Sequence, residues 1–297
     1  MKFKIFTLIV FAVNVTFSQN YKETFKKFSQ EKDSVGQLKT LKEWETKNEN
    51  ESELYTSYFN YYFSISKTEL ISINKNSNGK DGFQIKDSVG NSAGYIQPEK
   101  YYNEKYFDKA IKYIDKGITK FPKRLDMRFG KIYILGDSEN YVQFTSEIIK
   151  AIEYSNEIKN DWTWTDDKKL EDSKDFMLGS IQKYVTQLYN TGKDELLENM
   201  KNISETVLIY YPDHIESLSN VSIVYLIRKE YDKGLEYLKK AEKINPEDFV
   251  VLANIAQGYK MKNDKPNALK YYELVKKYGN TNAKKNAEEN IQLLKQK

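Results

Sequence analysis

Residues able to carry out nucleophilic, acid–base or metal chemistry are few in kind in this sequence. His214 is the one histidine and there is no cysteine, so a His-rich metal site, a Cys–His pair and a disulfide cannot be built. Asp and Glu total 43, so carboxylate pairs arise by chance on solvated helix faces. There is no glycine-rich phosphate loop and no Gly-x-Ser-x-Gly motif. We therefore expect no catalytic residues, no metal site and no cofactor, and we interpret His214 as a residue at a helix start.

Two tryptophans are the sharpest aromatic candidates for an interface. Trp162 and Trp164 lie in the stretch NDWTWTDDKK, which we interpret as a linker before a helix. Buried indoles there would fill the joint between two halves of a helical chain, since Trp usually buries most of its surface. Exposed indoles would instead anchor a protein interface. The sequence leaves both interpretations open.

The charge balance argues against a polynucleotide partner. The chain of 297 residues has a formal charge of +4, and two of its lysines, Lys2 and Lys4, belong to a segment that we expect to be removed. Nucleic-acid-binding proteins usually gather a basic excess on one face, and this sequence shows no such concentration. With 24 Tyr and 15 Phe, the chain has too much apolar side chain to be disordered. We expect a folded protein that does not bind nucleic acid.

Residues 1–18 have the layout of a secretory signal peptide. The basic stretch MKFK precedes the apolar run IFTLIVFAV, which is too short to span a bilayer comfortably. Thr16 and Ser18 then precede Gln19, so we expect cleavage after Ser18. A lipoprotein anchor would need a cysteine at that point, and none is present. We predict an exported protein, periplasmic or released, with no stable membrane span after cleavage; an uncleaved anchor or a buried first helix is the alternative.

After Pro212 the pattern of large, small and aromatic residues repeats at a fixed interval along the sequence. The aligned pairs are Leu218 with Leu252, Val221 with Ile255, Ser222 with Ala256, Tyr225 with Tyr259, Gly234 with Ala268, Leu238 with Tyr272 and Ala241 with Val275. Within each predicted helix these residues lie three or four apart, and therefore on one face. The small residues let the partner helix approach closely. The pattern predicts consecutive helical hairpins.

The period, about 34 residues, and the positions of large and small residues resemble the tetratricopeptide repeat (TPR). The resemblance is clearest over residues 215–280, within a predicted run of hairpins over 161–281. A degenerate form is expected over 19–160, and the polar stretch 282–297 fits a solvating cap. The resemblance implies an all-α, right-handed superhelix of antiparallel helical hairpins, in an exported bacterial TPR protein.

The helical period stops between about residues 67 and 97. The segments TELISI and GFQIKDS alternate in the manner of strands, and NKNSNGKD between them contains Asn-Gly and Asp-Gly turn signals. We predict a small β-hairpin inserted between two helices. Insertions in solenoids often emerge on the binding face, so the insertion would either cover or form the binding site.

The resemblance also assigns candidate residues to a concave binding groove. They are Tyr55, Phe59 and Tyr62 in the helix that starts near Glu51, and Ile223, Leu226, Gln257 and Lys260 nearer the C-terminus. The three aromatic residues exceed what the hairpin core requires, so we expect them either to pack under the β insertion or to line an aromatic groove. Tyr58, at a position that is usually small, predicts a different packing there.

These features favour a non-enzymatic scaffold that binds a protein or peptide partner outside the cytoplasm. Solenoids of this kind offer a long concave surface and seldom perform chemistry. The alternative is a glycan-binding or glycan-processing protein of the cell envelope, based on the aromatic residues of the groove together with Trp162 and Trp164. That alternative requires the aromatic side chains to form one exposed platform, flanked by two carboxylates in the case of an enzyme.

Overall fold

The computed structural model describes residues 20–76 and 82–296, which divide into two compact units. Within these residues, unit 1 comprises 20–139 and 162–170, and unit 2 comprises 140–161 and 171–296. The predicted signal peptide lies outside the described residues. The division predicted between residues 160 and 161 stays a prediction. No described helix combines the length and the apolar character needed to cross a membrane.

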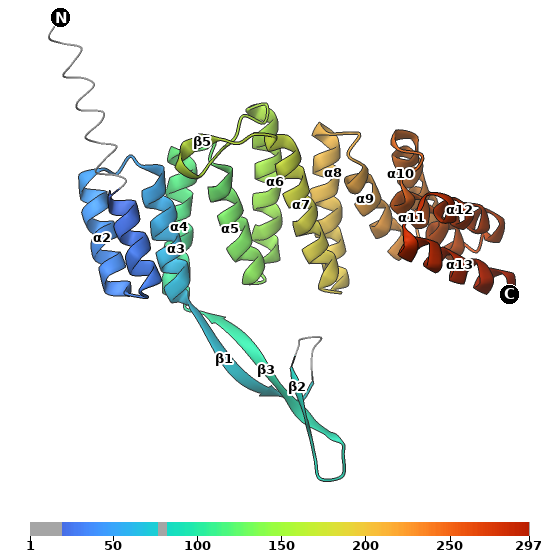
Figure 1. The fold of residues 1–297 in the computed structure, drawn as a ribbon, viewed down its shortest axis with the longest axis horizontal. Coiled ribbons are helices and arrows are strands. Elements are labelled where there is room, and N and C mark those ends of the chain that lie inside the picture. The colour runs from blue at the N-terminus through green and yellow to red at the C-terminus, as the bar shows by residue number, and fades with distance from the viewer. Residues whose placement is uncertain (1–19, 77–81, 297) are drawn as a thin grey trace, which may run out of the picture. The chain divides into compact units, whose positions relative to one another are not determined.

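Unit 1 is built from helices that pack in chain order (Figure 1). After a helix over residues 20–30, they are α2 (Ser34–Lys47), α3 (Ser52–Ser66), α4 (Glu104–Lys120) and α5 (Leu125–Asp137). Asp33 and Asn103 begin α2 and α4, because their side-chain oxygens accept hydrogen bonds from backbone N–H groups of the first turn. The helices bury an aromatic core between them.

Tyr58 shows how α3 and α4 pack where the repeat normally has a small residue. Its ring stacks on Tyr113 of α4, with centroids 4.0 Å apart and planes 13° apart. Its hydroxyl donates to Glu45 Oε2 at 2.8 Å. Burial and this bond raise the pKa of Tyr58 far above its ordinary value, so the hydroxyl stays protonated. At this position the hairpin therefore packs by stacked rings, where the repeat normally has a small side chain.

The insertion between α3 and α4 is a three-stranded antiparallel sheet (Figure 1). Its strands are β1 (Lys67–Asn74), β2 (Phe83–Lys86) and β3 (Ser92–Tyr102), in the order β1-β3-β2. The predicted β insertion is confirmed, but the predicted pairing is wrong. The two segments predicted as a hairpin form β1 and β2, and each of them pairs with β3. The sheet also continues past residue 97 to Tyr102.

Pro98 lies inside β3 without interrupting the sheet. The backbone N–H of Asn103 donates to Ser66 O, and N–H groups of a strand point alternately to its two sides. Position 98 therefore turns its nitrogen away from β1. The nitrogen therefore points to the side of β3 where β2 lies. Strand β2 does not reach position 98, because its pairing with β3 begins at Phe83, opposite Ile96. A proline here costs no ladder bond to a described strand.

A second, very short strand pair follows α6 in the chain but belongs to unit 1. Strand β4 (Thr163–Trp164) pairs with β5 (Lys168–Lys169) across a 3₁₀ turn over Thr165–Asp167. The backbone N–H of Thr163 donates to Lys123 O at 2.8 Å. This strand pair is thereby fixed to the residues that precede α5.

Unit 2 contains the helices of the clear repeat, which are α9 to α12, together with the helices before and after them. They are α6 (Tyr141–Glu157), α7 (Ser173–Asn190), α8 (Leu197–Tyr210), α9 (Ile215–Ile227), α10 (Tyr231–Ile244), α11 (Phe249–Met261), α12 (Lys265–Tyr278) and α13 (Thr281–Gln296), with a 3₁₀ turn at Asp194–Leu196. The start of α11 follows the start of α9 by one full period of the sequence pattern, and the start of α12 follows that of α10 by the same interval. The predicted all-α fold of antiparallel helical hairpins with a small β insertion is confirmed.

The repeated contacts explain why the sequence pattern returns at a fixed period. Tyr225 stacks on Tyr237 and Tyr259 stacks on Tyr271, each pair with ring centroids 5.8 Å apart. At Gly234 a Cβ atom would lie 2.9 Å from the side chain of Leu226, which is closer than real Cβ contacts allow. The small residue therefore lets α10 approach α9, as the sequence predicted.

Candidate functional site

The aromatic residues predicted to line a groove are buried in the core of unit 1. Tyr55, Phe59 and Tyr62 are 5%, 6% and 8% exposed. The expectation of an exposed aromatic groove is corrected by this burial. Side chains so deeply covered present no platform to a peptide or a glycan.

Helices α4 and α5 cover these rings. A Cβ atom at Gly117 would lie 2.9 Å from Tyr55 Cβ, and one at Gly130 would lie 3.1 Å from the ring of Phe59. The ring of Tyr62 stacks on Tyr113, with centroids 5.6 Å apart. The alternative expectation, that the β insertion covers the stripe, is therefore also wrong. Close helix approach at two glycines makes the stripe part of the hairpin core.

The C-terminal groove candidates have different environments. Leu226 is 5% exposed and packs where Gly234 and Gly258 leave room, so it is a core residue. Ile223 is half-buried. Gln257 is exposed and accepts a hydrogen bond from Tyr272 Oη at 3.1 Å, and half-buried Lys260 donates to Asn290 Oδ1 at 2.7 Å. Ile223, Gln257 and Lys260 thus keep some accessible surface, and their part in binding stays a prediction.

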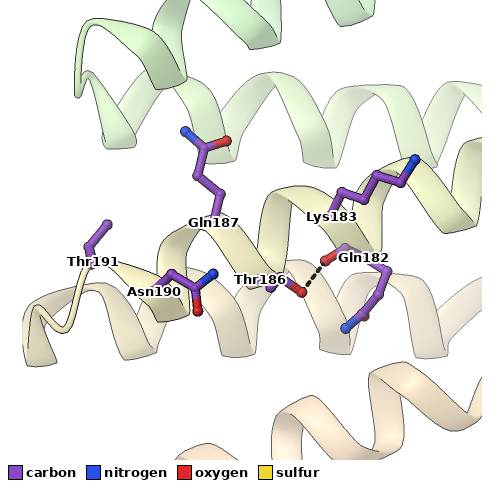
Figure 2. Close-up of a pocket in the computed structure, with 6 residues that line it drawn as sticks. All are labelled: Gln182, Lys183, Thr186, Gln187, Asn190 and Thr191. Atoms are coloured by element: carbon purple, nitrogen blue, oxygen red, sulfur yellow. Dashed lines mark hydrogen bonds between the residues drawn. The ribbon is translucent and has the colours of Figure 1, made fainter.

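An open surface lined by polar residue types lies on α7 in unit 2. Its residues enclose an open depression of about 510 Å³, shown in Figure 2. They are Gln182, Lys183, Thr186, Gln187, Asn190 and Thr191. The buried face of α7 carries Leu178, Ile181, Val185 and Leu188, so the depression lies on the polar face of an amphipathic helix. We call these six residues the α7 surface.

Hydrogen-bonding capacity on the α7 surface is only partly used within the protein. The hydroxyl of Thr186 donates to Gln182 O at 2.9 Å. The side-chain amides of Gln187 and Asn190 make no hydrogen bond to another described residue, although each carries donors and an acceptor. Lys183 is the one charged residue of the surface and is exposed. The surface is thus nearly neutral and rich in free amide groups.

An amide pair joins the α7 surface to α9. Asn220 Nδ2 donates to Gln182 Oε1 at 2.7 Å, and Gln182 Nε2 is 3.4 Å from Asn220 Oδ1. Asn220 is 6% exposed, so this pair is largely shielded from water and fixes the register of the two helices. The α7 surface is therefore carried by a helix that is bonded to its neighbour α9.

Both predicted interface tryptophans belong to unit 1. Trp162 is fully buried, with 0% exposure, and the guanidinium of Arg128 lies 5.6 Å from its ring centroid. Trp164 is half-buried and meets Phe129 edge-on, with centroids 6.3 Å apart. The interpretation of Trp162 as an exposed anchor is therefore wrong. The glycan hypothesis loses the exposed platform that it requires.

Arg124 is a structural centre that the sequence reasoning missed. Its side chain is 1% exposed and forms ion pairs with Glu53 at 2.7 Å, Asp126 at 2.7 Å and Asp167 at 3.1 Å. Lys22 adds ion pairs to Glu53 and Asp166. Glu53 and Asp167 lie 71 and 43 residues from Arg124 in the sequence, so these two pairings could not be inferred without a structure.

His214 is a helix cap, in agreement with its interpretation as a residue at a helix start. Its Nδ1 accepts from the backbone N–H of Ser217 at 3.3 Å and lies 2.8 Å from Ser217 Oγ. Its Nε2 lies 3.3 Å from Glu216 Oε2. Burial lowers the pKa of His214, against the opposing attraction of Glu216. Ser217 is only 3% exposed, so the arrangement closes the first turn of α9 and offers no reachable nucleophile.

Comparison with known proteins finds similar solved structures only. No protein-family model and no curated protein matches the chain. YrrB, a TPR protein with an unusual peptide-binding site, shares 11% identity over 84% of this chain and 97% of its own, with a TM-score of 0.41. PilF of Pseudomonas aeruginosa shares 16% identity over 59% of this chain and 69% of its own, with a TM-score of 0.37. MamA shares 16% identity over 61% of this chain and 93% of its own, with a TM-score of 0.36.

Proposed function

We propose that this protein is a non-enzymatic scaffold that binds a polypeptide partner on the α7 surface. The observation that carries the proposal is the pair of free side-chain amides, Gln187 and Asn190, on an open depression of about 510 Å³. A small-molecule site is usually an enclosed cleft that buries most of its ligand, whereas this depression on the protein surface is open. It therefore suits a chain that lies along it.

The chemistry of the α7 surface matches an extended polypeptide. Each amide side chain offers both a donor and an acceptor, which are the groups that an extended backbone presents in alternation. Lys183 supplies the one positive charge of the surface, so it favours a partner with a carboxylate at that point. The Gln182–Asn220 pair positions the surface before the partner arrives, and this lowers the entropy cost of binding.

Affinity capture with matched baits tests this proposal. The baits start at Gln19 and carry either the native residues, the double change Gln187→Ala and Asn190→Ala, or the control change Ser180→Ala. Ser180 lies on α7 outside the depression and bonds to Phe176 O of its own helix. A polypeptide retained by the native and control baits and lost by the double variant supports the proposal. Equal retention by all three baits contradicts it.

We also propose that the protein works outside the cytoplasm, on the basis of the signal-peptide layout of residues 1–18. The test expresses the full chain and a chain lacking residues 1–18 in a bacterial host. The full chain should appear in the periplasm or medium with the mass of a protein that begins at Gln19. Full-length protein retained in the cytoplasm would contradict export.

A further inference from the structure

The outer edge of β1 is an unprotected sheet edge. The strand order β1-β3-β2 leaves one side of β1 without a partner strand among the described residues. Its register against β3 runs without a bulge over all eight residues, Lys67 to Asn74, and the strand contains no proline. The opposite edge, β2, has four residues and a register shift between Ile85 and Lys86. Proteins usually blunt exposed edges with charges, bulges or proline, and only β2 is blunted by a bulge.

The alternation of the ladder identifies which backbone groups face outward. Because Asn103 donates to Ser66 O, the even-numbered residues of β1 turn their backbone groups toward β3. The odd-numbered residues therefore turn theirs to the free edge, including Glu69, Ile71 and Ile73. Such a row of donors and acceptors is complementary to another extended backbone.

The side chains along the same edge specify what kind of strand would fit. Ile71 and Ile73 are 80% and 72% exposed. Ile73 lies opposite Ile96, which lies opposite Phe83 in turn, so the three share one face of the sheet. Phe83 is 81% exposed. An added strand would extend this apolar row by placing alternate apolar side chains beside Ile71 and Ile73.

The charges along β1 determine where a charged residue of the added strand would fit. Lys67, near the helices, already pairs with Glu69 at 3.4 Å and Asp137 at 3.9 Å. From Leu70 to Asn74 the strand is uncharged. Lys75 follows, exposed and without an ion pair to any described residue. It lies in a bend directly after the end of β1, so a carboxylate at the corresponding end of the incoming strand would complement it.

We propose that the outer edge of β1 binds an extended segment of another polypeptide as a fourth, antiparallel strand. The segment carries an acidic residue beside Lys75, followed at alternate positions by apolar residues beside Ile73 and Ile71. In the antiparallel direction the acidic residue is nearer the N-terminus of the segment. This site lies in unit 1 and is independent of the α7 surface.

Two labelled peptides probe the edge directly. One has the sequence Asp-Thr-Ile-Thr-Ile-Thr-Thr, the other has Lys in place of Asp, and binding to the mature protein is followed by fluorescence anisotropy up to about 1 mM. The native protein should bind the Asp peptide more tightly. Lys75→Glu should reverse this preference. Opposite charges directly across strands contribute only about 0.2–1 kcal/mol, so the expected changes are about 1.4- to 5-fold.

Changes at Ile71 separate backbone pairing from side-chain contact. Ile71→Pro removes an outward N–H and should weaken binding at least fivefold, whereas Ile71→Thr keeps the N–H and should weaken it less. Equal melting temperatures of the two variants exclude misfolding, and the double variant of the α7 surface should bind like the native protein. Three results would overturn the proposal: no saturable binding to native protein, no difference between Ile71→Pro and native, or a native dimer in sedimentation that Ile71→Pro dissociates.

Discussion

Tyr113 of α4 stacks on Tyr58 of α3, and it lies three residues after the small residue Ala110. The same relation recurs in unit 2, where Tyr237 follows Gly234 and Tyr271 follows Ala268 by three residues. In those hairpins the stacking partner is Tyr225 or Tyr259, which occupy the same position in successive repeats. In unit 1 the partner ring comes one helical turn earlier, at the position usually occupied by a small residue.

Replacement of the stacked ring should destabilise unit 1 strongly. Tyr58 is 2% exposed, so Tyr58→Ala leaves a cavity between α3 and α4 and should cost about 3–5 kcal/mol in the free energy of unfolding. Tyr101→Ala, at a residue 49% exposed in the insertion, should change it by less than about 0.5 kcal/mol. Urea titration followed by circular dichroism measures both, and similar midpoints would show that the stack is dispensable.

Two glycines of unit 2 should respond oppositely to alanine. At Gly234 the new Cβ would meet Leu226 at 2.9 Å and the backbone oxygen of Ser222 at 3.1 Å, so Gly234→Ala should destabilise by about 1–3 kcal/mol. At Gly179 no atom lies within 4 Å of the new Cβ, so Gly179→Ala should stabilise α7 by about 0.5–1 kcal/mol. Thermal unfolding measures the melting temperatures of both variants and of the native protein. A melting temperature of Gly179→Ala below that of the native protein would contradict the prediction.

Loss of the buried cation should release the β4–β5 strand pair. Arg124→Met leaves Glu53 and Asp126 with side chains only 15% and 13% exposed, and removing one partner of a buried ion pair costs about 3–5 kcal/mol. The control, Lys168→Met, changes a side chain that is 78% exposed. Limited proteolysis should cut the Arg124→Met protein faster within residues 162–170. Equal cutting of the two variants would show that Arg124 does not hold this segment.

The cap of α9 should make stability depend on pH. Burial lowers the pKa of His214 in the folded protein. When the pH falls below the ordinary pKa of histidine, the unfolded chain therefore binds more protons than the folded one. The free energy of unfolding then decreases as the pH decreases. His214→Asn keeps a good capping side chain that does not titrate. From about pH 7 to about pH 5, native protein should lose more stability than His214→Asn. Parallel losses in urea titrations would exclude this role for His214.

The hairpins of unit 2 could be predicted from sequence because each contact recurs. Gly234 and Ala268 mark the close approach of two helices at the same position of successive repeats, so the second copy tests the interpretation of the first. Residues Tyr55, Phe59 and Tyr62 offered no such second copy. In the structure Gly117 packs against Tyr55 and Gly130 packs against Phe59. The sequence pattern does not contain these contacts between helices, so the aromatic residues were assigned to a groove.

Contacts between distant segments could not be predicted for a related reason. Asp167 lies 43 residues from Arg124, and no local pattern pairs them. Strand β3 was missed because the strand-like alternation was found only in TELISI and GFQIKDS, and the insertion was expected to end at about residue 97, whereas β3 continues through Pro98 to Tyr102. The α7 surface did have a signal in the apolar spacing of Leu178, Ile181, Val185 and Leu188, which leaves the opposite face of the helix to polar residues.

The central claim, that a polypeptide lies on the α7 surface, is tested most directly by calorimetric titration of the captured partner. Native protein and the Ser180→Ala control should bind it with the same affinity. The double variant Gln187→Ala and Asn190→Ala should bind at least tenfold more weakly, which corresponds to about 1.4 kcal/mol. Identical affinities for all three proteins, each melting like native, would contradict the claim and place the binding site elsewhere on the chain.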